Sequence, residues 1–209
     1  MIDVTEQISA VRREVGTRVL EAGEARTVTI SQVYPSAIED VWDACTNPER
    51  IPRWFLPVSG DLRLGGRYAL TGNASGTITS CDPPRAFDAT WEFGDAVTWI
   101  ELRLTPEPGG AGTRFALTHV AHVDDRWEQF GPGAVGVGWD LGVLGLAGHF
   151  GSAAVVDPSE GPAWLASEEG RSFVVLSSRG WCDANVAAGA DPDGARAAAE
   201  RTTVAYGAG

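Results

Sequence analysis

Alternating apolar and polar side chains mark a series of β-strands in the first two thirds of the chain. The alternation is clearest over 25–33, 87–93, 100–104 and 113–121. A period of two predicts strands that bury one face and turn the other towards solvent. Stretches rich in Gly, Pro and Asn separate these segments, so the pattern predicts turns between neighbouring antiparallel strands.

A weaker strand pattern runs from Leu62 to Leu70 and is interrupted by Gly65 and Gly66. Glycines inside a strand favour a bulge or a sharp bend. We therefore expect a curved sheet, with strand residues on both sides of the glycine pair.

Helical spacing begins after the first strand. Ser36 and Glu39 have the spacing of a capping box, which predicts a helix that starts at Ser36. Apolar residues then recur at helical intervals from Ile38 to Cys45, so one face of this helix should pack inward. Asn47-Pro48 predicts a second short helix, since Asn caps helices well and Pro is favoured at the first helical position.

A longer apolar helix is predicted over 139–150. Its glycines, Gly142, Gly145 and Gly148, lie about one turn apart. We expect their missing side chains to let the sheet approach closely, although each costs about 1 kcal/mol of helix propensity.

The rest of the chain is read as flanking structure. Residues 1–24 are expected to form a helix or a loosely held arm, and 124–136 a loop. Two further helical patterns, over 164–188 and from Pro192 to Tyr206, predict a helical extension. The expected organisation is an arm (1–24), a domain (25–157) and an extension packed on the same domain (158–209).

Composition narrows the classes of partner. The chain has 28 acidic and 16 basic side chains and a formal charge of -12, so nucleic acid and anionic membranes would be repelled. The cysteines, Cys45, Cys81 and Cys182, lie far apart, and no secretion signal is apparent, which favours free thiols and a cytoplasmic protein. No spacing typical of a zinc site occurs, so we expect neither a metal nor another cofactor.

Several short motifs resemble those of the SRPBCC superfamily. They are Pro-Arg-Trp-Phe-Leu-Pro at 52–57, Gly-Asp-Leu-Arg-Leu-Gly-Gly-Arg-Tyr at 60–68, Gly-Asn at 72–73 and Thr-Arg-Phe-Ala-Leu-Thr-His at 113–119. The nearer likeness is to the branch related to the activator of the heat-shock-protein ATPase, and plant-allergen and START lipid-binding domains are more distant. The resemblance covers about residues 25–157.

The resemblance implies an α+β helix-grip fold, in which a curved antiparallel sheet wraps around a long C-terminal helix and two short helices close one end. It implies no single activity, because this fold serves lipid carriers, aromatase-cyclases and chaperone regulators. The family offers no universal catalytic motif that could be transferred to residues of this chain.

Aromatic side chains provide the candidate ligand site. The chain has 8 tryptophans, and several rings fall where this fold would place a cavity wall. Filling the core is the simpler role for any one ring. The candidate lining residues are Trp54, Phe55, Tyr68, Phe87, Trp91, Phe115, His119, Trp127, Trp139 and Leu146.

His119 shares a strand face with Phe115 and Leu117, which places an imidazole among apolar residues. Such a histidine can act as a general base, but more often it is a buried residue that bonds a backbone carbonyl or, here, Tyr68. We therefore predict no catalytic residue.

Three functions remain open. The first is binding of a hydrophobic or aromatic small molecule between the sheet and the long helix. The second is an enzyme of the polyketide cyclase or aromatase kind, in which His119 and Tyr68 steer protons. The third is a chaperone-related or stress-related module that binds a protein partner. Homodimer formation is compatible with each.

Overall fold

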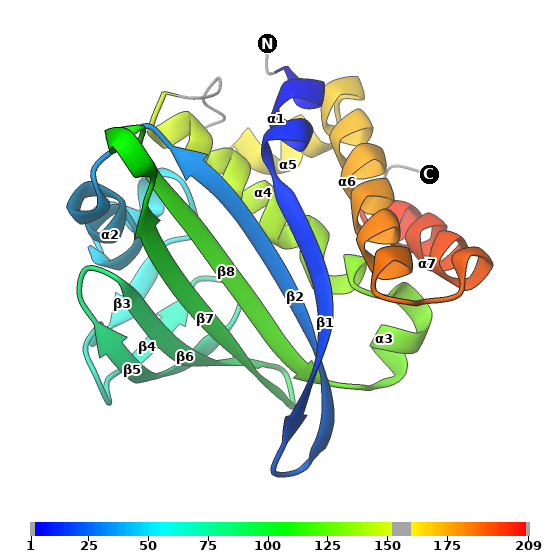
Figure 1. The fold of residues 1–209 in the computed structure, drawn as a ribbon, viewed down its shortest axis with the longest axis horizontal. Helices are drawn as coiled ribbons and strands as arrows, with labels where there is room; N and C mark the ends of the chain where they lie inside the picture. Colours follow the sequence, from blue (N-terminus) through cyan, green and yellow to red (C-terminus); the bar gives the residue numbers. More distant parts are fainter. Residues whose placement is uncertain (1–2, 152–159, 208–209) are drawn as a thin grey trace.

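A single curved sheet of eight antiparallel strands forms the frame of the protein, in the order β1-β2-β8-β7-β6-β5-β4-β3 (Figure 1). The computed structural model describes residues 3–151 and 160–207. The strands are β1 Arg12–Leu20, β2 Gly23–Tyr34, β3 Val58–Gly60, β4 Arg67–Leu70, β5 Ser75–Asp82, β6 Ala86–Phe93, β7 Ala96–Pro106 and β8 Thr113–His122.

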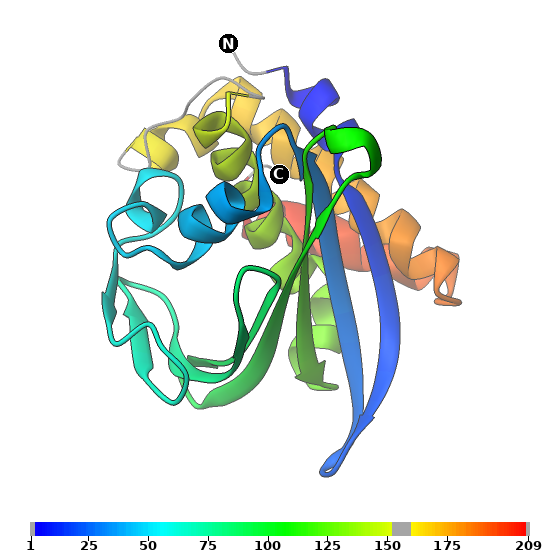
Figure 2. The ribbon, with the colours of Figure 1, turned by 60° about the vertical axis from the view of Figure 1, so that its left-hand side comes forward.

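Helices cover the concave side of the sheet. The long helix α4 lies in the curve of the sheet, α2 packs against β7 and β8, and α6 and α7 lie beyond α4 (Figure 2). This arrangement confirms the expected α+β helix-grip fold. The helices are α1 Val4–Ala10, α2 Ile38–Thr46, α3 Asp125–Phe130, α4 Gly133–His149, α5 Gly161–Leu165, α6 Glu168–Ala187 and α7 Pro192–Ala205, with 3-10 turns η1 Ile51–Arg53 and η2 Pro108–Gly110.

The alternating pattern of β6, β7 and β8 sets which side chains face the helix. In register, His119 of β8 lies between Val28 of β2 and Ile100 of β7. Leu102, Phe115 and Leu117 belong to one buried cluster with residues of α4, and this cluster is the main core. The strands predicted over 87–93, 100–104 and 113–121 are thus confirmed, because strict alternation fixes which face of a strand is buried.

The N-terminal segment differs from its expectation. Only Val4–Ala10 of this segment is helical, and Asp3 caps it by accepting the amide of Glu6 at 2.9 Å. Arg12–Leu20 is instead an edge strand that pairs with β2 along its whole length. Its burial alternates only between exposed and half-buried residues. A strand that buries neither face carries little hydrophobic pattern. The helix or loosely held arm expected over 1–24 was therefore wrong for 12–20.

Helix α2 begins at Ile38, two residues after the predicted start. Ser36 is no cap, because its hydroxyl hydrogen-bonds the carboxylate of Asp40, and the N-cap residue, Ala37, has no side-chain cap. Asn47 does accept the amide of Glu49 at 2.9 Å, but the short helix that follows is the 3-10 turn η1.

Two other expectations need correction. Leu62 and Leu64 lie in the loop between β3 and β4 rather than in a strand. Most of the loop expected over 124–136 is helical. Asp124 accepts the amide of Trp127 at 2.9 Å and caps α3, and α4 already begins at Gly133.

The C-terminal helices share the main core. Trp181 of α6 is 1% exposed and belongs to the same cluster as α4 and the sheet, and Gly136 of α4 leaves room for its indole. The helices predicted over 164–188 and 192–206 correspond to α5, α6 and α7. The expected boundary between domain and extension, at 157–158, lies outside the described residues.

Asp140 ties these layers together. This carboxylate in the middle of α4 is 1% exposed. It accepts hydrogen bonds from Arg13 of β1 at 2.6 and 3.0 Å, Ser177 at 2.6 Å and Trp181 at 2.8 Å. The sequence shows Asp140 only as an interruption of an apolar helix, whereas in the fold it joins β1, α4 and α6.

Candidate functional site

A cavity of about 510 Å³ lies between the concave face of the sheet and helices α2 and α4. We call it the main cavity. Strand β6 contributes Phe87, Ala89 and Trp91 at alternate positions, and β8 contributes Phe115 and Leu117 in the same way. The period of two in these strands thus turns a continuous apolar surface towards the helices.

Helix α2 closes one end of the main cavity. Trp42 and Cys45 lie one turn apart on its inner face and line the space. The Trp42 ring packs edge-on against Phe87, with ring centroids 6.3 Å apart. Trp42 was not among the candidates, although its helical spacing with Ile38 and Cys45 already placed it on the packed face.

The glycines of α4 admit the segment after η1 rather than the sheet. A Cβ on Gly145 would overlap the carbonyl oxygen of Trp54, and one on Gly142 would lie 3.5 Å from the Phe55 ring. Trp54 also donates its indole N–H to the Ala44 carbonyl of α2 at 2.9 Å. The expectation that the missing side chains let the sheet approach was therefore wrong for Gly142 and Gly145, which instead let Phe55 and Trp54 lie against the helix.

An aromatic wall bounds the main cavity on the side away from α2. Trp139 of α4 stacks on Phe55 at 6.2 Å and contacts Trp91 at 5.0 Å between ring centroids. These rings also line a second space, of about 350 Å³, which we call the second compartment. The aromatic wall therefore divides the hollow between sheet and helix into two parts.

His119 belongs to the second compartment. It is 3% exposed, and its Nδ1 accepts the indole N–H of Trp139 at 3.2 Å. Because an indole nitrogen can only donate, the neutral imidazole must carry its proton on Nε2. Burial lowers the pKa of His119 to about 4, so the ring is neutral at neutral pH.

The polar groups of the main cavity are few and offer no acid and base pair. Tyr68 lines it but donates its hydroxyl to the Thr90 carbonyl at 2.7 Å, and burial raises its pKa. Burial also raises the pKa of Cys45 to about 12, which keeps the thiol protonated. In residues 3–151 and 160–207, no group of His, Cys, Asp and Glu is arranged to hold a metal ion. The arrangement is suited to holding an apolar molecule.

The structure distributes the candidate residues over three places. Trp127 and His119 line the second compartment, and Leu146 is buried in the core beside neither space. The expected bond between His119 and Tyr68 is absent, since each has another partner. The main cavity is lined by the remaining candidates, Trp54, Phe55, Tyr68, Phe87, Trp91, Phe115 and Trp139.

Other residues that line the main cavity were missed. Ile100, Leu102 and Leu117 continue the alternation of β7 and β8, so the strand pattern alone could have identified them. Ile78 directly precedes an irregularity in the pairing of β5 with β6, and no simple pattern marks it.

Within the part of the chain that the structure describes, no helix is both long and apolar enough to cross a membrane. Cys45, Cys81 and Cys182 are free thiols in the structure.

The chain is similar to several proteins of known structure. CalU16 from Micromonospora echinospora is similar in two structures. Its crystal structure is 38% identical, covers 80% of this chain and 98% of that chain, and gives a TM-score of 0.61. Its solution structure is 35% identical, covers 86% of this chain and 97% of that chain, and gives a TM-score of 0.68.

A more distant structure, of protein MLL2253 from Mesorhizobium loti, supports the fold alone. It is 21% identical, covers 58% of this chain and 93% of that chain, and gives a TM-score of 0.52. No curated protein matches the chain. Residues 35–151 match the model of the family described as activator of Hsp90 ATPase homolog 1-like protein. The chain therefore belongs to this family, within the SRPBCC superfamily, as the motifs at 52–57, 60–68 and 113–119 indicated.

Proposed function

We propose that this protein binds a neutral, apolar small molecule with an aromatic portion in the main cavity. The observation that carries the proposal is a space of about 510 Å³ enclosed almost wholly by aromatic and aliphatic side chains. Small-molecule sites are commonly about 300–1,000 Å³ and mostly apolar.

The energetics favour a ligand of this kind. A ring system the size of an indole buries about 200 Å². At about 25 cal/mol per Å² this gives about 5 kcal/mol before the costs of association. A charged ligand would lose its hydration for little return, because the exposed Arg63 at the cavity is already paired with Asp61, and the Tyr68 hydroxyl is already bonded. The Cys45 thiol is protonated.

The other two functions have less support. A cyclase-like enzyme was expected to use His119 and Tyr68 together, but His119 lines the second compartment and Tyr68 the main cavity. Family membership is compatible with a protein partner, but no surface feature described above favours one. Ligand binding is therefore the function that the geometry supports best.

The test uses the neutral probe N-phenyl-1-naphthylamine, whose emission rises in apolar surroundings. Wild-type protein should bind one equivalent. Two variants narrow the main cavity from different sides, Ile78→Trp from the sheet and Cys45→Phe from α2. Each should weaken binding at least tenfold, while Val19→Trp, at a position 85% exposed on β1, should not change it.

Native mass spectrometry of gently purified protein adds an independent measurement, because a resident molecule would appear as a reproducible extra mass. Failure of the wild-type protein to bind the probe would contradict the proposal. Equal affinities for the Ile78→Trp, Cys45→Phe and Val19→Trp variants would contradict it as well.

A further inference from the structure

The second compartment differs from the main cavity in chemistry. It lies between the open end of the concave sheet face and helices α3 and α4, and its volume is about 350 Å³. Its aromatic lining includes Trp91, Trp127 and Trp139. Its lining also includes Arg26, Arg126, Asp124 and His119, whereas Arg63 is the one charged side chain in the described lining of the main cavity.

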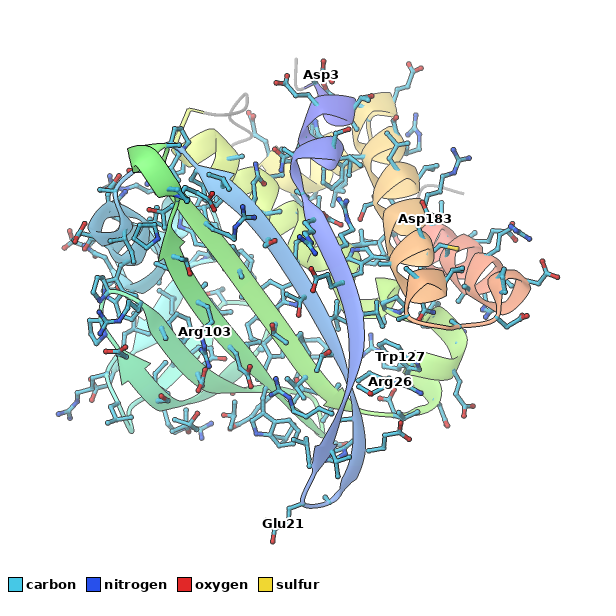
Figure 3. The ribbon with its side chains drawn as sticks, viewed as in Figure 1. Asp3, Glu21, Arg26, Arg103, Trp127 and Asp183 are labelled. Atoms are coloured by element: carbon cyan, nitrogen blue, oxygen red, sulfur yellow. The ribbon has the colours of Figure 1, made fainter. Side chains whose placement is uncertain are left out.

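Arg26 brings a cation onto this face of the sheet. In register, Arg26 lies opposite Ala121, and Val28 lies opposite His119, so Arg26 and His119 belong to the same face of neighbouring strands. The guanidinium carbon lies 6.0 Å from the centre of the Trp127 ring (Figure 3). This contact holds the guanidinium at the wall of the compartment.

The guanidinium lacks an anionic partner. Among the residues that the structure describes, Arg26 makes no ion pair, and its buried Nε has no hydrogen-bond acceptor. An unsatisfied donor of this kind is costly to bury, and a charged one more so. The position therefore calls for an acceptor supplied from outside the chain.

His119 adds a second unpaired donor. Its Nδ1 is occupied by the Trp139 indole, so Nε2 carries the proton, and no described residue accepts it. The side chain is 3% exposed and lines the compartment. The imidazole N–H of His119, which lines the compartment, and the buried guanidinium Nε–H of Arg26 thus come from adjacent strands of one pocket.

The balance of charge at this site favours an anion. Arg126 also lines the compartment, and it is exposed. Asp124 is the one carboxylate in the described lining, and its Oδ1 already accepts the amide of Trp127. His122 adds no free donor at Nδ1, which lies 3.2 Å from the Glu24 carbonyl.

We propose that the second compartment binds an aromatic carboxylate, whose ring lies among Trp91, Trp127 and Trp139 and whose carboxylate is held by Arg26 and His119. A guanidinium presents a planar fork of N–H groups that matches a carboxylate, and the indole faces suit an aromatic ring. The site is separate from the main cavity, so this inference goes beyond the proposed function and does not depend on it.

The probes that test the proposal are 2-naphthoate and its neutral counterpart 2-naphthamide, titrated calorimetrically. The carboxylate should bind more tightly than the amide. Arg26→Gln should weaken 2-naphthoate about 10- to 100-fold, which corresponds to the loss of a hydrogen bond to a charged group. It should leave 2-naphthamide within twofold. The matched control, Arg12→Gln, removes an exposed arginine of β1 and should change neither affinity.

Further variants separate the possible outcomes. Arg26→Lys keeps the charge but loses the planar fork of N–H groups, so its affinity for 2-naphthoate should lie between those of wild type and Arg26→Gln. This variant also tests the proposal if Arg26→Gln fails to fold. Ile78→Trp narrows only the main cavity and should leave 2-naphthoate binding unchanged. If Ile78→Trp abolished binding while Arg26→Gln did not, the ligand would occupy the main cavity and the second site would be overturned.

Inorganic phosphate tests whether the aromatic walls matter. We expect it to bind at least tenfold more weakly than 2-naphthoate. Equal affinities of phosphate and 2-naphthoate would overturn the aromatic part of the proposal. Equal binding of 2-naphthoate by the Arg26→Gln and Arg12→Gln variants would overturn the proposal as a whole.

Discussion

Replacing Asp140 by asparagine should destabilise the protein strongly, because this one carboxylate accepts from three side chains, Arg13 of β1 and Ser177 and Trp181 of α6. Arg13 and Asp140 form an ion pair whose side chains are 7% and 1% exposed. Oδ2 accepts from Arg13 Nε, Ser177 and Trp181, and Oδ1 accepts from Arg13 Nη2. An asparagine amide has one oxygen, so its NH₂ group must face at least one of these donors.

The magnitude follows from burial. Removing one partner of a buried ion pair leaves an uncompensated charge and costs about 3–5 kcal/mol. For a domain of this size each kcal/mol lowers the melting temperature by about 2–4 °C. Asp140→Asn should therefore lower the midpoint by about 6–20 °C. Glu14→Gln is the matched control, since its ion pair with Arg12 has side chains 54% and 73% exposed and should contribute less than about 1 kcal/mol.

The assay is thermal unfolding at neutral pH, followed by circular dichroism. It compares wild type, Asp140→Asn and Glu14→Gln with the single variants Arg13→Met and Asp140→Leu and their double variant. The double variant should lose less than the sum of Arg13→Met and Asp140→Leu, because no charge is left buried alone. If Asp140→Asn were no more destabilising than Glu14→Gln, the reasoning from the buried network would be refuted.

Two further predictions concern the walls of the site. Gly145→Ala should destabilise the protein by about 1–3 kcal/mol, because the new Cβ would overlap the Trp54 carbonyl oxygen. The Cβ of Gly142→Ala would lie 3.5 Å from Phe55, so this variant should be neutral or stabilising by up to about 1 kcal/mol. Thermal unfolding in which both variants shift the melting temperature in the same direction from wild type would contradict this prediction. Burial lowers the folded-state pKa of His119 from 6.5 to about 4, so the unfolded chain binds its proton first as the pH falls. The stability that neutral His119 contributes is complete above about pH 6.5 and is lost on approaching pH 4; at about 1.4 kcal/mol per pKa unit the loss is about 3 kcal/mol. His119→Gln should therefore show a flatter dependence in urea unfolding between pH 7 and pH 4, and parallel curves for variant and wild type would argue against a buried neutral imidazole.

The sequence predicted those elements whose burial is one-sided. Strands β6, β7 and β8 each turn one face towards the helices, so the alternation of apolar and polar residues predicted them. The helix-grip fold was predicted from the motifs around these strands. β1 carries no such pattern because it is an edge strand with both faces partly exposed. Its place is set by pairing with β2, which is a long-range contact that no local pattern encodes.

The candidate site was partly predictable for the same reason. Aromatic residues at alternate positions of a strand, such as Phe87 and Trp91, lie on the same face of that strand and line the main cavity together. The division of the hollow into two parts depends on how Trp139 meets Phe55 and Trp91, which come from three separate elements. No local sequence pattern predicts this aromatic wall or the role of Asp140.

The central claim is that the main cavity has room for an apolar guest, and a crystal structure of the protein with N-phenyl-1-naphthylamine tests it most directly. The account predicts that the probe lies among Trp42, Phe87 and Leu117, with Trp139 still stacked on Phe55 as it is without ligand. Electron density that shows these side chains packed against one another, with the space of about 510 Å³ closed and the probe absent, would contradict it.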